Sequence, residues 1–294
     1  MLPWRRASSC TRSVLRPDRM DPLLLLVWAV IFFFGASLGS FLNVCISRWP
    51  AELSVVSPRS RCPRCEKSIA WYDNIPIVSW VLLRAKCRGC GLPISAQYPL
   101  IELVVGVIWV LTVWYFGLSL TALRIGVAST ILLGVLMTDL QHYVIPDGFT
   151  VTGFLIAMVM PVVALIVGEQ GPFVGPWDAL VGACVGAGLI AIVGWLGEVA
   201  MGREAMGEGD ATLMAMIGAM VGVERSFLTV FVAAGIGAGV FLLVVAPIGW
   251  VRSRSRGEEY ELPLVPFGVF LAPAGIVTLL FGDAILARYF AFVA

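Results

Sequence analysis

Long apolar stretches alternate with short polar connections along most of the chain, and charged or turn-forming residues bound each stretch. Apolar runs of this length predict helices rather than strands. We expect eight helices, at 23–46, 99–117, 121–138, 149–168, 178–200, 211–223, 226–250 and 267–290. A helix needs about 20 apolar residues to cross a bilayer, so the sixth is short for a span and is expected to begin inside the protein. The pattern predicts an all-α polytopic membrane protein with about eight transmembrane helices.

Composition excludes several other classes of protein. The chain has 294 residues, of which 59% are hydrophobic and 13% are charged, and its mean hydropathy is +0.93. Soluble domains contain about 45–50% apolar and about 25% charged residues, so neither a soluble fold nor a disordered chain is expected. The formal net charge is +1, and no basic domain stands apart from the apolar runs. The lipid bilayer is therefore the expected partner, and nucleic acid is not.

Glycine is frequent in the fifth and seventh predicted helices. The residues concerned are Gly182, Gly186, Gly188, Gly235, Gly237 and Gly239. Small residues at such spacing let helix backbones approach closely in lipid. We therefore expect both helices to pack centrally, with these glycines at helix contacts.

The basic residues predict the orientation in the membrane, because loops rich in Lys and Arg stay in the cytoplasm. The only long polar stretch between spans is 47–98, and it contains eight of them. They are Arg48, Arg59, Arg61, Arg64, Lys67, Arg84, Lys86 and Arg88. The loops near 118–120 and 169–177 contain neither Lys nor Arg. We expect 47–98 to face the cytoplasm and both chain ends to lie outside.

The first 19 residues disagree with this orientation, since they carry five arginines on the side predicted to be outside. No convincing signal-peptide cleavage site follows them. Our hypothesis is that Met20 is the true start and that 1–19 is a non-native extension. N-terminal mass mapping of the native protein that finds peptides from 1–19 would refute it.

Four of the seven cysteines form two pairs, Cys62-x2-Cys65 and Cys87-x2-Cys90, separated by 21 residues. Paired knuckles of this kind can hold zinc tetrahedrally through four thiolates. Structural disulfides are rare in the cytoplasm, so a metal is favoured over a disulfide; a redox pair and the absence of a joint site stay open. A metal would also supply stability that a segment of about fifty residues cannot obtain from its own core. We expect a small cytoplasmic zinc-knuckle insert at 47–98.

Three aspartates lie at one predicted edge of the membrane: Asp139 at the end of the third helix, Asp147 before the fourth, and Asp210 at the start of the sixth. Ionisable groups at membrane depth are costly and are therefore candidates for function. Helix capping is an alternative role for Asp147 and Asp210. Helix capping does not explain Asp139, because a carboxylate at a helix C-terminus faces the negative end of the dipole. A solvated loop position is the alternative that stays open for this residue.

The chemical interpretation of these residues is a protease with paired aspartates. Two carboxylates held close together cannot both ionise easily, so one keeps a proton near neutral pH. The ionised group can then deprotonate a water while the protonated one donates to a peptide carbonyl. Gly207 and Gly209 beside Asp210 leave room for substrate backbone. His142 is the only histidine, and neither a Gly-x-Ser-x-Gly turn nor a His-Glu-x-x-His helix is present.

Several motifs, in order along residues 20–290, carry a resemblance to a known family. They are Gly39-Ser40-Phe41-Leu42-Asn43-Val44, Arg59-Ser60-x-Cys62-Pro63-x-Cys65, Trp71-Tyr72-Asp73-Asn74-Ile75-Pro76, Asp139-x7-Asp147 and Gly207-x-Gly209-Asp210. In these motifs the chain resembles the bacterial prepilin peptidases, which are membrane aspartic peptidases with a Gly-x-Gly-Asp motif.

The resemblance implies an inner-membrane endopeptidase that removes the basic leader of type IV prepilins and type II secretion pseudopilins at the cytoplasmic face. Asp139 and Asp210 match the catalytic aspartates of the family, while Asp147, Gly207 and Gly209 would support them. Many members also methylate the new N-terminal residue with S-adenosylmethionine. The cysteine-containing segment is associated with that activity, so its retention implies a bifunctional enzyme.

The same resemblance implies a division of the chain. Residues 20–46 would form the first transmembrane helix, 47–98 the cytoplasmic four-cysteine zinc-binding segment associated with methyl transfer, and 99–294 the membrane-embedded peptidase. Two positions depart from the family pattern: Thr212 stands where lysine is frequent after Gly-x-Gly-Asp, and Gln97 replaces arginine before Tyr-Pro. The first departure removes a charge near Asp210, and the second removes a basic contact.

Other classes of protein make different predictions. A transporter would place aspartates near the bilayer midplane and would have two related halves. A zinc-anchored membrane scaffold would use the aspartates only as helix caps and would tolerate Asp139→Asn and Asp210→Asn. A signal peptidase with another substrate would differ only in substrate assays. The sequence does not indicate an oligomeric state.

Overall fold

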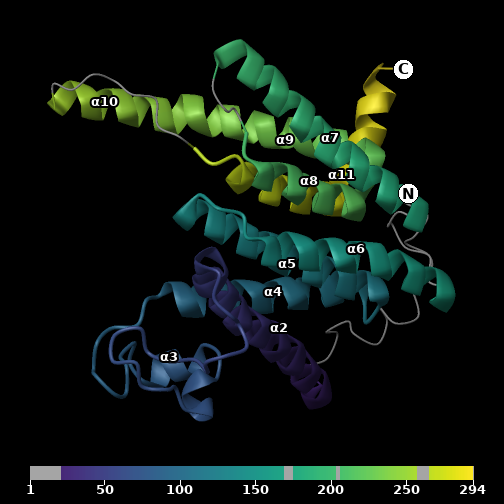
Figure 1. The fold of residues 1–294 in the computed structure, drawn as a ribbon. Coiled ribbons are helices and arrows are strands. Elements are labelled where there is room, and N and C mark those ends of the chain that lie inside the picture. The colour runs from purple at the N-terminus through teal and green to yellow at the C-terminus, as the bar shows by residue number, and fades with distance from the viewer. Residues whose placement is uncertain (1–20, 169–174, 203–205, 257–264, 294) are drawn as a thin grey trace. The chain divides into compact units, whose positions relative to one another are not determined.

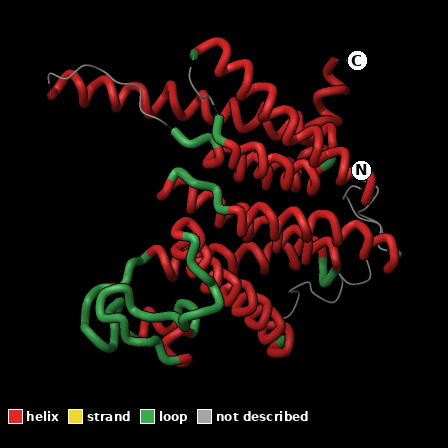
Figure 2. Tube along the Cα trace, viewed as in Figure 1, coloured by secondary structure: helices red, strands yellow, loops and turns green. Residues whose placement is uncertain are grey.

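The computed structural model describes residues 21–168, 175–202, 206–256 and 265–293. They fall into two compact units (Figure 1). One unit lies within Met1–Gly134 and Ile166–Pro172, and the other within Val135–Leu165 and Phe173–Ala294. The proposed non-native extension, 1–19, lies outside the described residues. Figure 2 shows helices joined by loops, and over the described ranges no segment forms a strand.

All eight predicted helices are present, and several are longer than the apolar runs that predicted them. The long helices are α2 (Pro22–Arg48), α4 (Gln97–Phe116), α5 (Leu120–His142), α6 (Asp147–Val167), α7 (Pro176–Met201), α8 (Glu208–Val221), α9 (Val223–Val240), α10 (Ala246–Arg256) and α11 (Gly268–Val293). A π-helical turn, η4 (Phe241–Val245), joins α9 to α10, so these two helices make one long span. The prediction of an all-α membrane fold is confirmed.

Seven of the described helical segments are long and apolar enough to cross a bilayer. The eighth, α8, has 14 residues, and 9 of them are buried in the protein. Its length is below the span of about 20 residues that a bilayer requires. Its buried residues are covered by neighbouring helices of the same unit. This is the short sixth helix of the sequence analysis, which was expected to begin in a protein interior. Asp210 in its first turn is buried, but Glu208 and Thr212 are exposed, and most of the buried residues follow from Leu213 onward.

The first unit is built on the pair α2 and α4. A Cβ added to Gly39 would lie 2.8 Å from the Glu102 Cα, so the two helix backbones meet closely at this point. The Asn43 amide donates to the Tyr98 carbonyl at 3.1 Å, and the Trp109 indole N–H donates to Thr130 at 3.2 Å. These contacts connect α2 to α4 and α4 to α5.

The segment between α2 and α4 is mostly loop and contains three short helices. They are η2 (Trp49–Ala51), η3 (Trp71–Asn74) and α3 (Val78–Leu82). Trp80 donates its indole N–H to the Ile94 carbonyl at 3.2 Å, which ties α3 to the segment that enters α4. In Figure 1 this insert is the loop-rich segment around the label α3.

The second unit contains a close contact between α7 and α8. A Cβ on Gly182 would collide with the Gly218 carbonyl oxygen, and one on Gly186 would collide with the Met214 carbonyl oxygen. Because Gly182 and Gly186 have no side chain, the backbones of α7 and α8 can touch, as expected for these two residues.

The same expectation is wrong for three other glycines, whereas Gly237 does lie at a helix contact. Gly188, Gly235 and Gly239 have open space where a Cβ would be, and Gly237 meets the Phe270 ring of α11 rather than a backbone. The spacing of glycines shows that close approach is possible but not which face of the helix is packed. A hydrogen bond of 2.7 Å between the Thr229 and Thr278 hydroxyls joins α9 to α11 instead.

Candidate active site and metal site

Asp139 lies in the last turn of α5, which runs to His142 and thus beyond the predicted end at 138. Only 4% of the residue is exposed. Its carboxylate lies at the first turn of α11, where the backbone N–H of Val269 is directed at it. The positive end of the α11 dipole thus offsets the unfavourable end of α5. This contact explains how a carboxylate is tolerated at the C-terminus of its own helix.

One oxygen of this carboxylate is unusual. Oδ2 of Asp139 is buried and has no hydrogen-bond partner among the described residues. A Cβ built on Gly268 would lie 2.6 Å from this oxygen and 2.9 Å from Cδ1 of Ile145. The first residue of α11 therefore has to be glycine for the carboxylate to occupy this position. A buried acceptor without a partner is rare in proteins and is typical of groups reserved for chemistry.

Asp210 is the third residue of α8 and is 8% exposed. Its backbone N–H donates to the Gly207 carbonyl at 3.1 Å, and Gly207 is the extended residue that precedes the helix. Burial raises the pKa of Asp210 to about 6, and the negative charge of Asp139 adds to the shift. The two carboxyl groups are thus close enough to oppose each other's ionisation.

The remaining predicted residues surround this pair to different degrees. A Cβ on Gly209 would lie 3.2 Å from the Ile145 Cβ, so Ile145 packs against both glycines, Gly209 and Gly268. Asp147, by contrast, is exposed in the first turn of α6. The Thr212 hydroxyl donates to the Gly209 carbonyl at 3.0 Å, within its own helix. The pair is therefore Asp139 with Asp210, and Asp147 is solvated.

Sequence reasoning missed three residues of this site: Ile145, Gly268 and Val269. Gly268 is one of 31 glycines, and no periodic signal marks it. Its role is visible only once α11 is placed against the end of α5.

The four predicted cysteines come together in the first unit. Their sulfur atoms all lie within 4.8 Å of one another, and the Sγ atoms of Cys62 and Cys90 are 4.0 Å apart. The cluster could hold a metal ion.

The two knuckles have matching backbones. Cys62 N–H donates to the Lys67 carbonyl at 3.0 Å, and Cys87 N–H donates to the Leu92 carbonyl at 2.8 Å. In each knuckle the residue after the second cysteine has positive φ, 55° at Glu66 and 71° at Gly91. Backbone N–H groups of Cys65 and Arg64 lower the pKa of the Cys62 thiol to about 6, and those of Cys90 and Gly89 lower the pKa of Cys87. Thiolates are the form that binds metals.

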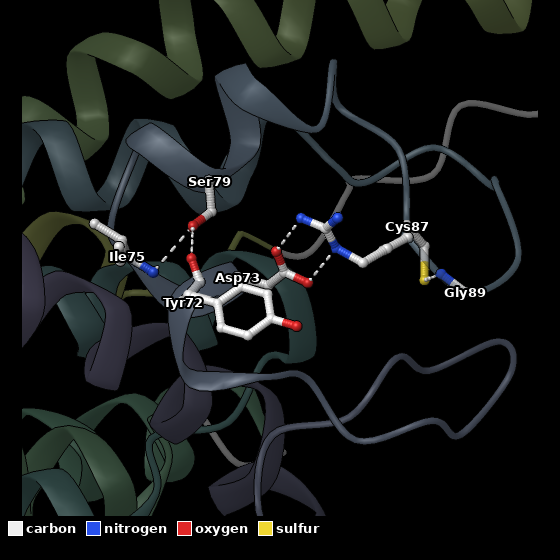
Figure 3. Close-up of polar contacts among 7 residues, drawn as sticks. Tyr72, Asp73, Ile75, Ser79, Cys87 and Gly89 are labelled. Atoms are coloured by element: carbon white, nitrogen blue, oxygen red, sulfur yellow. Dashed lines mark hydrogen bonds and ion pairs between the residues drawn. The ribbon is translucent and has the colours of Figure 1, made fainter.

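A network of polar contacts supports the second knuckle (Figure 3). The Arg88 guanidinium donates to both oxygens of Asp73 in η3, each at 2.7 Å. The Ser79 hydroxyl donates to the Tyr72 carbonyl at 2.9 Å and accepts the Ile75 N–H at 3.1 Å. These bonds fix η3 relative to the cysteines.

The insert is also fastened to the membrane helices. Glu102 of α4 is 8% exposed, and its carboxyl group accepts the Ile77 N–H at 2.7 Å. Ile77 has φ +62°, a strained value for a β-branched residue, so this bond holds the chain in an unusual conformation. Glu102 also takes a hydrogen bond from the Ser40 hydroxyl of α2. One buried carboxyl group therefore joins α2, α4 and the insert.

Fold and site together define an integral membrane protein with a buried pair of carboxyl groups and a separate four-cysteine insert. Two family models match the chain: the bacterial peptidase A24 N-terminal domain over residues 33–116, and the type IV leader peptidase family over residues 126–243. The chain belongs to the type IV leader peptidase family.

Three similar proteins carry the name prepilin leader peptidase/N-methyltransferase. The protein of Myxococcus xanthus is 39% identical over 79% of this chain and 67% of its own. Those of Stutzerimonas stutzeri and Pseudomonas aeruginosa are 35% and 33% identical, each over 92% of this chain, and over 96% and 95% of their own lengths. No solved structure matches the chain. Family membership favours the peptidase over the transporter and scaffold alternatives.

Proposed function

We propose that this protein removes the basic leader peptide from type IV prepilins and type II secretion pseudopilins, and then N-methylates the exposed residue. The names of its relatives and its membership of the type IV leader peptidase family support both activities. In this proposal 20–46 is the first transmembrane helix, 47–98 is a cytoplasmic segment associated with methyl transfer, and 99–294 is the peptidase. The protein lies in the inner membrane, with cleavage at its cytoplasmic face.

Asp139 and Asp210 are the proposed catalytic residues. Because their carboxyl groups oppose each other's ionisation, the pair holds one proton. The ionised carboxylate removes a proton from a water, and that water attacks the scissile carbonyl carbon. The protonated carboxyl group donates to the carbonyl oxygen, and proton return to the amine then releases the leader.

The observation that carries this proposal is the burial of the two carboxyl groups, each at the N-terminal turn of a helix. Asp139 is 4% exposed beside the start of α11, and Asp210 is 8% exposed in the first turn of α8. Helix N-termini favour developing negative charge, so they also suit a tetrahedral oxyanion at this site. A pilin has a basic leader and an apolar mature helix, so a site at the membrane edge suits such a substrate.

The methyl donor of the proposed second activity is S-adenosylmethionine, which supplies an electrophilic methyl group on a sulfonium. The part of this chain assigned to that activity is the insert, held to α2 and α4 by Glu102. Its contribution is to bind the donor and to orient the acceptor amine outside the hydrocarbon.

We also propose that Cys62, Cys65, Cys87 and Cys90 bind a structural zinc ion. Tetrahedral zinc with Zn–S bonds of about 2.3 Å places its sulfur ligands about 3.8 Å apart. The sulfurs here lie within 4.8 Å of one another, and both knuckles present backbone N–H groups toward the thiolates. The donor set and its spacing therefore fit zinc.

Leader cleavage tests the peptidase. Detergent-solubilised protein would be incubated with a prepilin from the same genome, and Asp139→Asn and Asp210→Asn would be compared with wild type. We expect each variant to lose cleavage by about 10³-fold or more, because neither can complete the proton transfers. Asp178→Asn is the matched control, since Asp178 is an exposed carboxylate in the first turn of α7. Cleavage by either catalytic variant at the wild-type rate would contradict the assignment.

A further inference from the structure

A cavity of about 450 Å³ lies between the C-terminal half of α2 and the insert. One wall is a single face of α2, formed by Ser37, Ser40, Phe41, Val44 and Arg48. The opposite wall is the insert itself, over residues 55–60 and 69–76. Its volume lies within the range of about 300–1,000 Å³ that is usual for small-molecule sites.

The cavity lies where α2 leaves the bilayer. This helix has 27 residues and is therefore about 40 Å long, which exceeds the hydrocarbon thickness of about 30 Å. The excess length and the positive charge of Arg48, the last residue of α2, favour a position of this end beyond the hydrocarbon. In that position, a ligand bound beside Arg48 would be reached from water.

Two guanidinium groups supply positive charge to the cavity. Arg48 is held in place by donating to the Ser54 carbonyl at 2.9 Å and to the Pro58 carbonyl at 2.8 Å. Arg59 lies on the insert side and is exposed. Guanidinium groups at such a rim suit a carboxylate ligand, which they can bind through paired N–H donors.

A hydrogen-bond acceptor lies on the α2 wall of the cavity. Ser40 lines the cavity, and its hydroxyl is hydrogen-bonded to the buried Glu102 carboxyl group. Because the Ser40 hydroxyl donates its proton to Glu102, its oxygen is left to accept a hydrogen bond from the cationic part of a ligand. The cavity therefore offers separate environments for a negative and a positive group.

Aromatic rings complete the lining. Trp71 is 79% exposed, although a large apolar side chain is usually covered, and its ring meets Tyr72 edge-on at 5.8 Å between centroids. Phe41 is 52% exposed on the α2 wall. Exposed indole and phenyl faces bind planar heterocycles by stacking and cations by their π faces.

From this combination we propose that the cavity is the binding site for S-adenosylmethionine. The amino-acid carboxylate would face Arg48 and Arg59, the cationic groups would face Ser40 with Glu102 behind it, and the adenine would stack on Trp71. In the transfer, the acceptor amine forms a bond to the methyl carbon while the carbon–sulfur bond breaks. Its electron pair stays on sulfur, and the amine proton passes to water. This inference rests on the methyl transfer proposed above.

Photolabelling locates the site without relying on activity. Full-length protein in detergent would be irradiated with methyl-tritiated S-adenosylmethionine and digested with trypsin. We expect label on peptide 68–84, which contains Trp71 and is bounded by Lys67 and Arg84. Excess S-adenosylhomocysteine should abolish labelling. Label confined to peptides outside the cavity walls overturns the proposal.

Variants and a lipid competitor sharpen the test. Trp71→Ala and Arg59→Gln should each weaken equilibrium binding of the donor by roughly tenfold. Trp177→Ala is the matched control, because Trp177 is 74% exposed in the second unit, and it should bind as wild type does. Micelles of short-chain phosphatidylethanolamine carry a phosphate and an amine and should not displace the donor. Displacement by these lipids would identify the cavity as a headgroup site, and full binding by Trp71→Ala would show that Trp71 does not hold the adenine. Either result overturns the proposal.

The same preparation separates this inference from the proposed function. Wild-type protein that cleaves and methylates a prepilin but labels outside the cavity refutes only the location of the donor. Wild-type protein that labels on 68–84 without cleaving a prepilin supports the donor site and contradicts the peptidase.

Discussion

Replacing Gly268 by alanine tests whether the start of α11 positions Asp139. The new Cβ would lie 2.6 Å from Oδ2 of Asp139 and 2.9 Å from Cδ1 of Ile145. Ordinary contacts lie at about 3.5–4.0 Å, so the carboxylate has to move by on the order of 1 Å. A displacement of this size at a reacting group lowers the rate about 10²-fold. The overpacking itself destabilises the fold by about 1–3 kcal/mol.

The assay is steady-state cleavage of a prepilin by detergent-solubilised protein. We expect kcat to fall about 10²-fold with KM nearly unchanged, because Gly268 is a positioning residue and the remote substrate contacts stay intact. Gly239→Ala is the matched control, since it adds the same methyl group to α9 in open space. It should cleave normally.

A double variant identifies the contact responsible. Ile145→Ala in the Gly268→Ala background removes the clash with Ile145 but leaves the clash with Asp139. We expect the rate to stay low. A Gly268→Ala enzyme within threefold of wild type, or a double variant restored to the wild-type rate, would refute the positioning role.

Two further predictions concern the insert. Cys62→Ser removes one of the four ligands, so it should lower the metal content from one ion per chain to a small fraction, as measured by elemental mass spectrometry. Cys184→Ser lies outside the cluster and should keep the metal. Equal metal content in the two variants would argue against the site. Arg88 holds the pKa of Asp73 below its ordinary value through two hydrogen bonds and its charge. The stabilisation from this ion pair is therefore fully present above about pH 4, and it is lost only as the pH falls through the lowered pKa. Hydrogen exchange around residues 73 and 88, corrected for intrinsic rates, should therefore be equal at pH 7 and pH 5 and faster in Asp73→Asn; loss of protection in wild type between these pH values would contradict the assignment.

The helices could be predicted because each one is an apolar run that ends at turn-forming residues. Gly222, for example, separates α8 from α9 with φ +82°, a conformation in which only glycine is unstrained. The cysteine cluster was equally predictable, since each knuckle is a local turn whose geometry is contained in a few consecutive residues. Local pattern sufficed for both features.

Contacts between distant segments could not be predicted in the same way. The sequence marked Asp139 as unusual for a helix C-terminus but gave no sign that the first turn of α11 would face it. The family resemblance ranked Asp147 as a supporting residue, but the residue pattern alone did not separate it from the buried pair. Nor did the pattern separate Gly182 and Gly186 from Gly188, Gly235 and Gly239, which contact no backbone. Which face of a helix is packed depends on all its neighbours together.

The backbone contact between α7 and α8 has a consequence for the height of Asp210. Gly182 and Gly218 meet with no side chain between them, two turns along α8 from the aspartate. Sliding α8 by one residue would move Asp210 by about 1.5 Å and turn it by about 100°. It would also bring a larger side chain against the Gly182 backbone, which has no room for one. The glycine contact therefore sets the register of α8, so a residue with no chemistry of its own determines where a reacting carboxyl group lies.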